Sequence, residues 1–247
     1  MWTRAELKKE ARNVLKSCYW SALLVTVITS VVDNVYKVTS VVFEDMPVIR
    51  GKTLAMAALA DLNLAELMAI IGVMMLTAFA GSLITVFVAG PISVGEKRYF
   101  LEGTQYRFDI NNILHGFTCG KYLNVVFTNL LVNIFTALWT LLFIIPGIIK
   151  GYAYAMTPYI LAENPNIKPM QAINLSCRMT KGHKLELFVL GLSFIGWYML
   201  GALAFGIGTA FVVPYDRATH AQFYLALRSE ALHKGIVRLE ELEYGLH

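Results

Sequence analysis

The stretch YLNVVFTNLLVNIFTALWTLLFIIPGII, residues 122–149, decides the class of fold, because it contains no Asp, Glu, Lys or Arg. A second charge-free stretch runs from Leu67 to Gly95. About 20 predominantly apolar residues cross the hydrocarbon core of a bilayer as a helix, so both stretches are long enough. Neither stretch alternates like a strand, and lipid offers no water to unpaired backbone groups. The sequence therefore predicts an all-α polytopic transmembrane helix bundle.

Composition agrees with this class. The chain is 57% hydrophobic and only 15% charged, whereas soluble domains are about 25% charged. The net charge of +4 is small and spread among loops, which indicates orientation and contact with anionic headgroups. We therefore expect one integral membrane domain over residues 1–247, with membrane lipids as partners and no nucleic acid. Other membrane proteins or a second copy of the chain are further candidate partners.

Apolar segments predict about six spans, at residues 19–38, 66–90, 122–144, 147–162, 185–204 and 207–227. The last apolar run leaves two alternatives: one long helix, or two spans with a turn at residues 206–208. Lys and Arg gather in residues 1–18, 91–121, 163–184 and beyond 228, and these segments alternate correctly if the N-terminus is cytoplasmic. A basic C-terminus on the same side requires an even number of spans. Six spans with both ends inside are therefore preferred to five.

Residues 1–18 predict an amphipathic helix at the membrane interface. Thr3 and Glu6 have the spacing of a capping box. An apolar stripe opposite a basic face suits a helix that lies on the membrane surface, and the stripe consists of Leu7, Ala11, Val14, Leu15 and Cys18. Further surface helices are expected around residues 109–118 and after Pro169, which suits a first helical position.

Lys150 lies just behind the break that Pro146 makes between the third and fourth spans. In one interpretation it is about one turn into the fourth span and extends its side chain to the headgroups. In the other, Lys150 and the helix N-terminus together hold an anionic lipid phosphate or a substrate carboxylate. Gly147, Gly151 and Ala155 recur every four residues, a pattern typical of close helix packing.

Asp216, Arg217, Thr219 and His220 form a candidate intramembrane polar cluster. In the six-span topology they fall within the last span, where ionisable residues are functional candidates. Alternatively, Asp216 and Arg217 pair structurally or face cytoplasmic water, as in the tail of a five-span protein.

Motifs that carry catalysis are not found. The sequence has no HExxH, GxSxG or P-loop motif and no pair of carboxylates suited to acid–base work. Cys18, Cys119 and Cys177 are too far apart for a zinc motif. We therefore expect no catalytic residue, no cofactor and no bound metal, and the interpretation is that the protein is not an enzyme.

Four segments together resemble a bacterial membrane family known as domain of unknown function 975. They are RAELKKEARNVLKSCYW (4–20), IPGIIKGYAYAMTPYILAENP (145–165), AINLSCRMTKGHKLELFVLGLSFIGW (172–197) and GIGTAFVVPYDRATHAQFY (206–224). The resemblance implies a polytopic protein of the bacterial inner membrane. It also implies a broad likeness to the membrane-anchoring region of some glycerophosphodiester phosphodiesterases. The family has no assigned reaction, so the resemblance supplies no catalytic residues.

Three functions follow as hypotheses. The first is a non-enzymatic membrane component that acts in assembly, as a scaffold or by interacting with lipids. The alternative is a small transporter or export component that uses the broken fourth and sixth spans. A lipid-acting enzyme is the second alternative, and it depends only on the phosphodiesterase likeness. A hydrated polar cavity at mid-membrane would favour transport, whereas a solid bundle would favour the first hypothesis.

Overall fold

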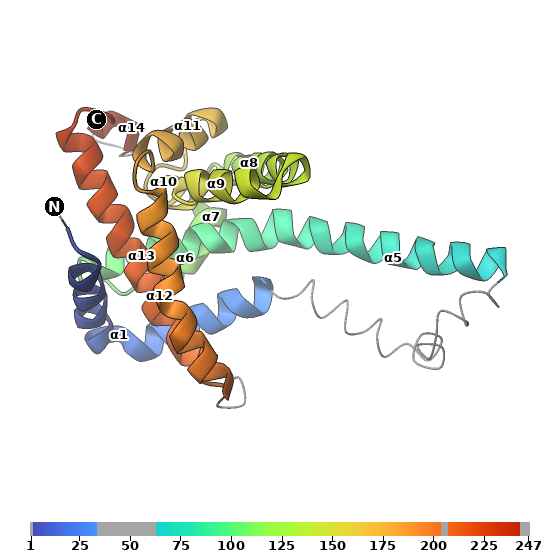
Figure 1. Cartoon of the computed structure of the whole chain (residues 1–247), viewed down its shortest axis with the longest axis horizontal. Coiled ribbons are helices and arrows are strands. Elements are labelled where there is room, and N and C mark those ends of the chain that lie inside the picture. The colour runs from blue at the N-terminus through green and yellow to red at the C-terminus, as the bar shows by residue number, and fades with distance from the viewer. Residues whose placement is uncertain (1, 34–62, 204–206, 243–247) are drawn as a thin grey trace. The chain divides into compact units, whose positions relative to one another are not determined.

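The computed structural model describes three stretches of the chain, residues 2–33, 63–203 and 207–242. Every regular element within these stretches is a helix (Figure 1), which confirms the predicted all-α fold. Contacts divide the chain into two compact units, residues 1–29 with 90–247 and residues 30–89. The first of these, called the larger unit below, contains all the residues of the candidate site.

Four helical stretches among the described residues are long and apolar enough to cross a membrane. They are Arg4–Val32, Ile71–Gly103, Tyr122–Leu142 and Lys184–Leu203. These stretches overlap the predicted first, second, third and fifth spans, although the first begins at Arg4 and the second extends to Gly103. Residues 34–38 of the first predicted span lie outside the described residues. The structure thus has helices of the length and composition that a membrane protein needs.

The predicted fourth and sixth spans are not among these four. The fourth is interrupted at residues 155–156, so that α9 (Ile144–Tyr154) and α10 (Thr157–Glu163) are separate short helices. Pro158 lies in the first turn of α10, where a missing backbone N–H removes no hydrogen bond. The sixth belongs to α13 (Ile207–His233), which is long but carries polar and charged side chains along its length. The count of six spans therefore stays a prediction.

Helix α1 (Arg4–Asp33) begins at the predicted capping box. The backbone N–H of Thr3 donates to Glu6 Oε2 at 2.7 Å, and that of Glu6 donates to Thr3 Oγ1 at 3.3 Å. The helix is kinked at Cys18, whose backbone has φ −137° and ψ 18°. The kink separates the charged segment from the apolar one, at the boundary expected between the interfacial helix and the first span.

The apolar stripe of α1 does not form a free membrane-binding face, which corrects the predicted role of residues 1–18. Its members pack inside the protein, with exposed fractions of 7% or less for Leu7, Ala11, Val14, Leu15 and Cys18. Helices α12 (Lys184–Leu203) and α13 provide partners, because Lys8 Nζ lies 4.4 Å from the Phe194 ring centroid and the Tyr215 hydroxyl donates to the Lys8 carbonyl at 3.5 Å. An amphipathic pattern fits a protein surface as well as it fits a lipid surface.

The second predicted span does not end at Gly90–Pro91. Helix α5 (Leu64–Ile84), the π-helical turn η1 (Thr85–Ala89) and α6 (Gly90–Gly103) follow one another directly. A proline inside a helix clashes with the carbonyl four residues earlier. The wide π-helical turn lies where that carbonyl falls, and this explains why the helix continues. Charged residues after Pro91 that were expected in a loop are therefore on a helix.

Shorter helices agree with the local sequence signals. The expected helix around residues 109–118 consists of η2 (Ile110–Leu114) and α7 (His115–Thr118), and Asp109 Oδ1 accepts from the Asn111 N–H at 2.9 Å. Helix α11 (Pro169–Met179) begins at the predicted proline. The polar side chains Gln171, Asn174 and Arg178 of this helix are exposed.

Two helical hairpins organise the larger unit. Helix α8 (Tyr122–Leu142) packs on α9, and α12 packs on α13. A Cβ atom added to Gly201 would lie 2.7 Å from the backbone carbon of Gly208, so the two backbones touch near the turn. The alternative of one long helix over this region is therefore wrong, while residues 204–206 of the predicted turn lie outside the described residues.

The interruption between α9 and α10 is stabilised by α11. Ser176 Oγ donates to the Ala153 carbonyl at 2.7 Å and accepts from the Met156 N–H at 3.2 Å. The Thr180 hydroxyl also lies within hydrogen-bonding distance of the Ala153 carbonyl, at 3.3 Å. These bonds satisfy backbone groups that the missing helical turn leaves open. The break is thus held by specific partners.

Candidate functional site

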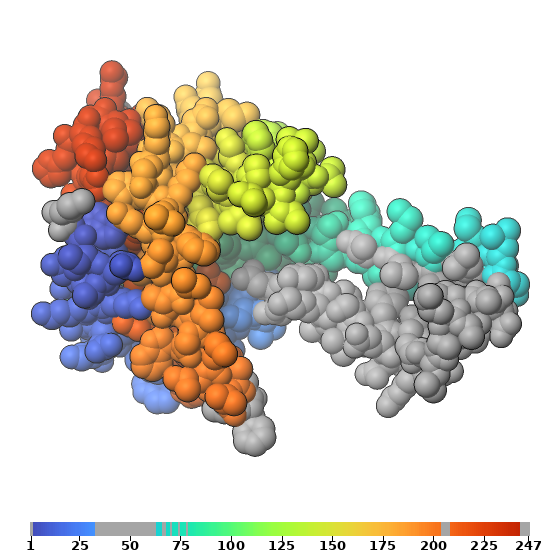
Figure 2. Space-filling model, in the orientation of Figure 1, coloured from blue at the N-terminus to red at the C-terminus, as the bar shows by residue number. Residues whose placement is uncertain are grey.

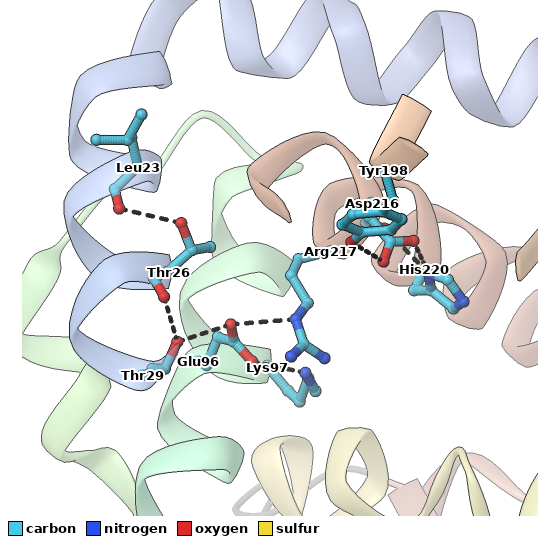
Figure 3. Close-up of polar contacts among 9 residues, drawn as sticks. All are labelled: Leu23, Thr26, Thr29, Glu96, Lys97, Tyr198, Asp216, Arg217 and His220. Carbon is cyan, nitrogen blue, oxygen red and sulfur yellow. Dashed lines mark hydrogen bonds and ion pairs between the residues drawn. The ribbon is translucent and has the colours of Figure 1, made fainter. Parts of the chain in front are cut away.

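A cluster of charges around the buried Glu96 lies where α1, α6 and α13 meet (Figure 3). We call it the charge centre, and it consists of Thr29, Glu96, Lys97 and Arg217. Glu96 is 1% exposed, and its Oε2 lies 2.7 Å from Lys97 Nζ. On the other side, Glu96 Oε1 accepts from the Thr29 hydroxyl at 3.1 Å and lies 3.4 Å from Arg217 Nε. One carboxylate thus joins three helices.

Pairing explains how the carboxylate of Glu96 is tolerated in the core. An isolated buried charge is expensive, whereas a charge with partners and hydrogen bonds is tolerated. The carboxylate of Glu96 is close to two cations, Lys97 and Arg217, and accepts a hydrogen bond from the Thr29 hydroxyl. Lys97 also lies 5.6 Å from the centroid of the Tyr159 ring on α10. The centre is therefore a packed, paired arrangement that holds helices together.

The predicted polar cluster on α13 divides into separate contacts. Asp216 Oδ2 accepts from the Tyr198 hydroxyl of α12 at 2.8 Å, and Asp216 Oδ1 lies 2.9 Å from His220 Nδ1. Arg217 extends instead toward Glu96. Thr219 is fully buried and donates to the Tyr215 carbonyl of its own helix at 2.7 Å. Asp216 and Arg217 thus contact different neighbouring helices, α12 and α6.

Sequence reasoning missed Glu96 and Lys97, which are the most deeply buried charges of the site. They follow the second charge-free stretch in the motif GEKR, and Gly90–Pro91 was interpreted as the end of a helix. An acidic residue next to a basic one, directly after a long apolar run, was the sequence signal that could have identified them. Tyr198 was missed because a single hydroxyl within an apolar span has no local pattern.

A second polar contact continues from the charge centre along α10 and α13. The rings of Tyr159 and Tyr224 stack with centroids 5.1 Å apart. The Tyr224 hydroxyl donates to Glu163 Oε2 at 2.8 Å, and Arg228 Nε donates to the same oxygen at 3.1 Å. Paired charges therefore tie α10 to α13 as well as α6 to α13.

Lys150 lies further along its helix than the sequence indicated. Because α9 begins at Ile144, Lys150 is nearly two turns from the helix N-terminus. Its Nζ lies 4.8 Å from the centroid of the Trp139 ring on α8, a cation–π geometry. At this distance the helix N-terminus cannot bind an anion together with Lys150, as one interpretation of the sequence required. The role of Lys150 in lipid contact stays a prediction.

The three small residues of this region differ in their surroundings. A Cβ atom on Gly147 would lie 2.4 Å from Thr140 Oγ1 and 2.6 Å from Thr140 Cα, so α8 and α9 approach closely there. A Cβ atom on Gly151 would meet only Thr136 Cγ2, at 4.0 Å. Ala155 lies at the C-cap of α9, outside the helix. Close packing is therefore concentrated at Gly147.

A groove of about 520 Å³ lies between α1, α12 and α13. Aromatic side chains and two basic side chains of α1 line it; the main members are Arg12, Lys16, Tyr19, Trp197, Phe211 and Tyr215. Trp197 is 53% exposed and Phe211 is 46% exposed. Figure 2 shows the side chains of α12 on the surface of the larger unit. We call this feature the aromatic groove.

A more polar pocket of about 630 Å³ lies where α12 begins and α13 ends. His183 is one of its lining residues, with Nδ1 2.9 Å from Glu186 Oε2 and Nε2 3.2 Å from Glu230 Oε1. Trp2 covers one side, and its ring centroid lies 6.0 Å from that of His183. Within the stretches that the structure describes, no group of three or more His, Cys, Asp or Glu residues is arranged to hold a metal ion.

These features define an all-α protein with helices suited to a membrane and a buried charge centre. Residues 140–231 match the family model described as "Protein of unknown function (DUF975)". The match confirms the resemblance found in the sequence. It includes Lys150, Asp216 and Arg217, whereas Arg12 and Glu96 lie outside it. Comparison with curated proteins and comparison with solved structures gave no match.

Proposed function

We propose that the protein is a non-enzymatic component of the bacterial cytoplasmic membrane that binds lipid, with both termini in the cytoplasm. The aromatic groove is the observation that carries the proposal. Its lining combines aromatic rings with two basic side chains of α1. Lipid molecules have the same division into an apolar and a charged part.

The position of the groove along α1 supports this function. Lys16 is the last charged residue before a charge-free run that extends to Val32. Tyr19 and Trp20 follow it directly, and Trp20 is 75% exposed. Tyr and Trp are enriched where the headgroups meet the hydrocarbon core. The groove therefore lies at the point along α1 where the charged segment is followed by the apolar one.

The charge centre favours a structural or lipid-binding role over transport. Glu96 and Lys97 are almost completely buried and are in contact with each other. Substrate sites of transporters are usually formed by broken helices that expose polar groups to the substrate. The break between α9 and α10 fits that description in part and supports transport as the second candidate. Ser176, however, binds the open backbone groups at this break.

Lipid retention during purification tests the proposed function. The full chain is purified in a mild detergent, and bound lipid is measured by native mass spectrometry. We expect the wild type to retain lipid, and we expect the double variant Trp197→Ala/Phe211→Ala to retain much less. Met199→Ala is the matched control, because Met199 is 65% exposed on the same helix and lies outside the groove. A wild type without retained lipid would refute the proposal.

A cysteine-accessibility scan over residues 212–224 tests the topology. If α13 crosses the membrane, membrane-impermeant thiol reagents should label only one end of this segment. Uniform labelling would show that α13 lies in water and would remove the sixth span. A reporter at each terminus, assayed for cytoplasmic exposure, completes the test of the predicted orientation.

A further inference from the structure

We infer that the aromatic groove holds one anionic phospholipid, with its phosphate between Arg12 and Lys16 and an acyl chain along Trp197 and Phe211. The inference rests on the proposed lipid binding and adds the class of headgroup and the residues that select it. The inference assigns selection of the headgroup to residues of α1. These residues lie outside the part of the chain that matches the family.

Two cations, Arg12 and Lys16, are among the residues that line the groove. Arg12 and Lys16 are four residues apart on α1, so their side chains point to the same side of the helix. Both side chains are exposed. Among the described residues no carboxylate forms an ion pair with either of them, and no Asp or Glu lines the groove. A zwitterionic lipid would bring an ammonium group that finds no acid here, so an anionic headgroup fits better.

Arg12 is oriented by its surroundings. Its guanidinium carbon lies 5.8 Å from the centroid of the Tyr215 ring. An arginine that rests on an aromatic face keeps its N–H donors available at its edge, where they can bind two phosphate oxygens. Lys16 adds a point charge one turn further along the helix. The two cations together give a phosphate one bidentate partner and one electrostatic partner.

The apolar part of the groove is formed by three helices that are tied together. The Tyr19 hydroxyl of α1 donates to the Phe211 carbonyl of α13 at 3.1 Å, which fixes α1 just after its kink. Trp197 of α12 forms the facing wall. A groove of about 520 Å³ has the size of a small-molecule site. It can hold a headgroup and the first part of an acyl chain while the rest of the lipid stays in the bilayer.

Headgroup selectivity tests the inference. Binding of phosphatidylglycerol and of phosphatidylcholine with identical acyl chains is measured on the full chain in detergent by native mass spectrometry. The test variant is Arg12→Gln/Lys16→Gln. The matched control is Arg4→Gln/Lys9→Gln, which removes the same charge from exposed positions of the same helix outside the groove.

We expect the wild type and the control to prefer phosphatidylglycerol by about tenfold or more, since each basic residue near an anionic lipid contributes measurably. The test variant should bind the two lipids almost equally. The conservative variant Arg12→Lys/Lys16→Arg should retain the preference, which separates a charge effect from misfolding. Trp197→Ala should weaken the binding of both lipids to a similar degree.

Three outcomes would contradict the inference, the proposed lipid binding or both. If the test variant keeps the preference, or if the control loses it equally, the inference is wrong. If the wild type binds both lipids equally well, the headgroup assignment fails while the proposed lipid binding stands. If the wild type binds neither lipid, both the inference and the proposed function fail.

Discussion

Arg217 Nε on α13 lies 3.4 Å from Glu96 Oε1 on α6. The same carboxylate contacts Lys97 and Thr29, so the charge centre connects α13 and α1 through one residue of α6. The close-up in Figure 3 shows these side chains converging on Glu96 while Asp216 is directed toward Tyr198 and His220. Packing of the larger unit thus depends on a few buried charges as well as on apolar contact.

Substitution of Glu96 should destabilise the fold strongly. Glu96→Gln removes the carboxylate that Lys97 and Arg217 share in the charge centre. Breaking a buried pair in this way costs about 3–5 kcal/mol of unfolding free energy. Unfolding in detergent, followed by circular dichroism, measures the effect. Glu10→Gln is the control, because Glu10 is exposed on α1, and equal stability of the two variants would contradict the prediction.

The hairpin of α8 and α9 should respond differently to alanine at its two glycines. Gly147→Ala places a methyl group 2.6 Å from Thr140 Cα, so a backbone must move. Overpacking of this kind costs about 1–3 kcal/mol. Gly151→Ala has ordinary contact distance to Thr136 and should be neutral or stabilising by up to about 1 kcal/mol. Melting temperatures of the two variants, measured side by side, should therefore shift in unequal amounts, and equal shifts would argue against close packing at Gly147.

Lys150 and Trp139 should be coupled energetically. A double-mutant cycle with Lys150→Met and Trp139→Leu isolates their interaction from the packing that each side chain makes alone. A cation over an aromatic ring contributes about 0.5–1 kcal/mol at a partly exposed site. Chemical unfolding of the four proteins gives the coupling. Additive effects within error would show that Lys150 points elsewhere, as its predicted role in lipid contact would allow.

The short helix α14 (Leu239–Leu242) should detach at low pH. Burial opposes ionisation of Glu241, but the Arg238 N–H and the Arg178 guanidinium outweigh it and lower the pKa of this carboxyl below 4.5. A lowered folded-state pKa gives stability that is present above the unfolded value and is lost as pH falls through the folded value. Amide protection of α14, corrected for intrinsic exchange, should decrease as the pH falls below 4.5 toward the lowered pKa of Glu241.

Glu241→Gln is the control for this pH dependence. The variant cannot form the charged contact to Arg178 that the wild type makes at 2.9 Å. Its α14 protection should be low at every pH and should change little with acidification. Retention of a steep acid transition in the variant would assign the effect to another group.

Local patterns predicted much of the fold. The charge-free stretches identified apolar helices, because hydrocarbon excludes charge whatever the neighbours are. The capping box at Thr3 and Glu6 and the helix start at Pro169 form as predicted. Each of these signals depends on residues within one or two turns, so a single sequence is sufficient to identify it.

The site could be predicted only in part, because its partners are distant in the chain. Asp216 and Arg217 were candidates from their place in an apolar segment, but nothing near them indicates Tyr198 or Glu96. Gly90–Pro91 suggested a helix end, and the π-helical turn before it reverses that conclusion. The stripe of α1 was assigned to lipid because the hydrophobic pattern does not distinguish a bilayer from a neighbouring helix.

The charge centre has a consequence for the order of events during synthesis. The α8–α9 and α12–α13 hairpins join neighbouring segments, so each can form soon after it leaves the ribosome. Glu96 and Lys97 are made early, whereas Arg217 arrives only with α13. Until then the two early charges have each other, and Thr29 supplies a hydroxyl. Arrival of Arg217 therefore marks the step at which a nascent bundle becomes a completed one.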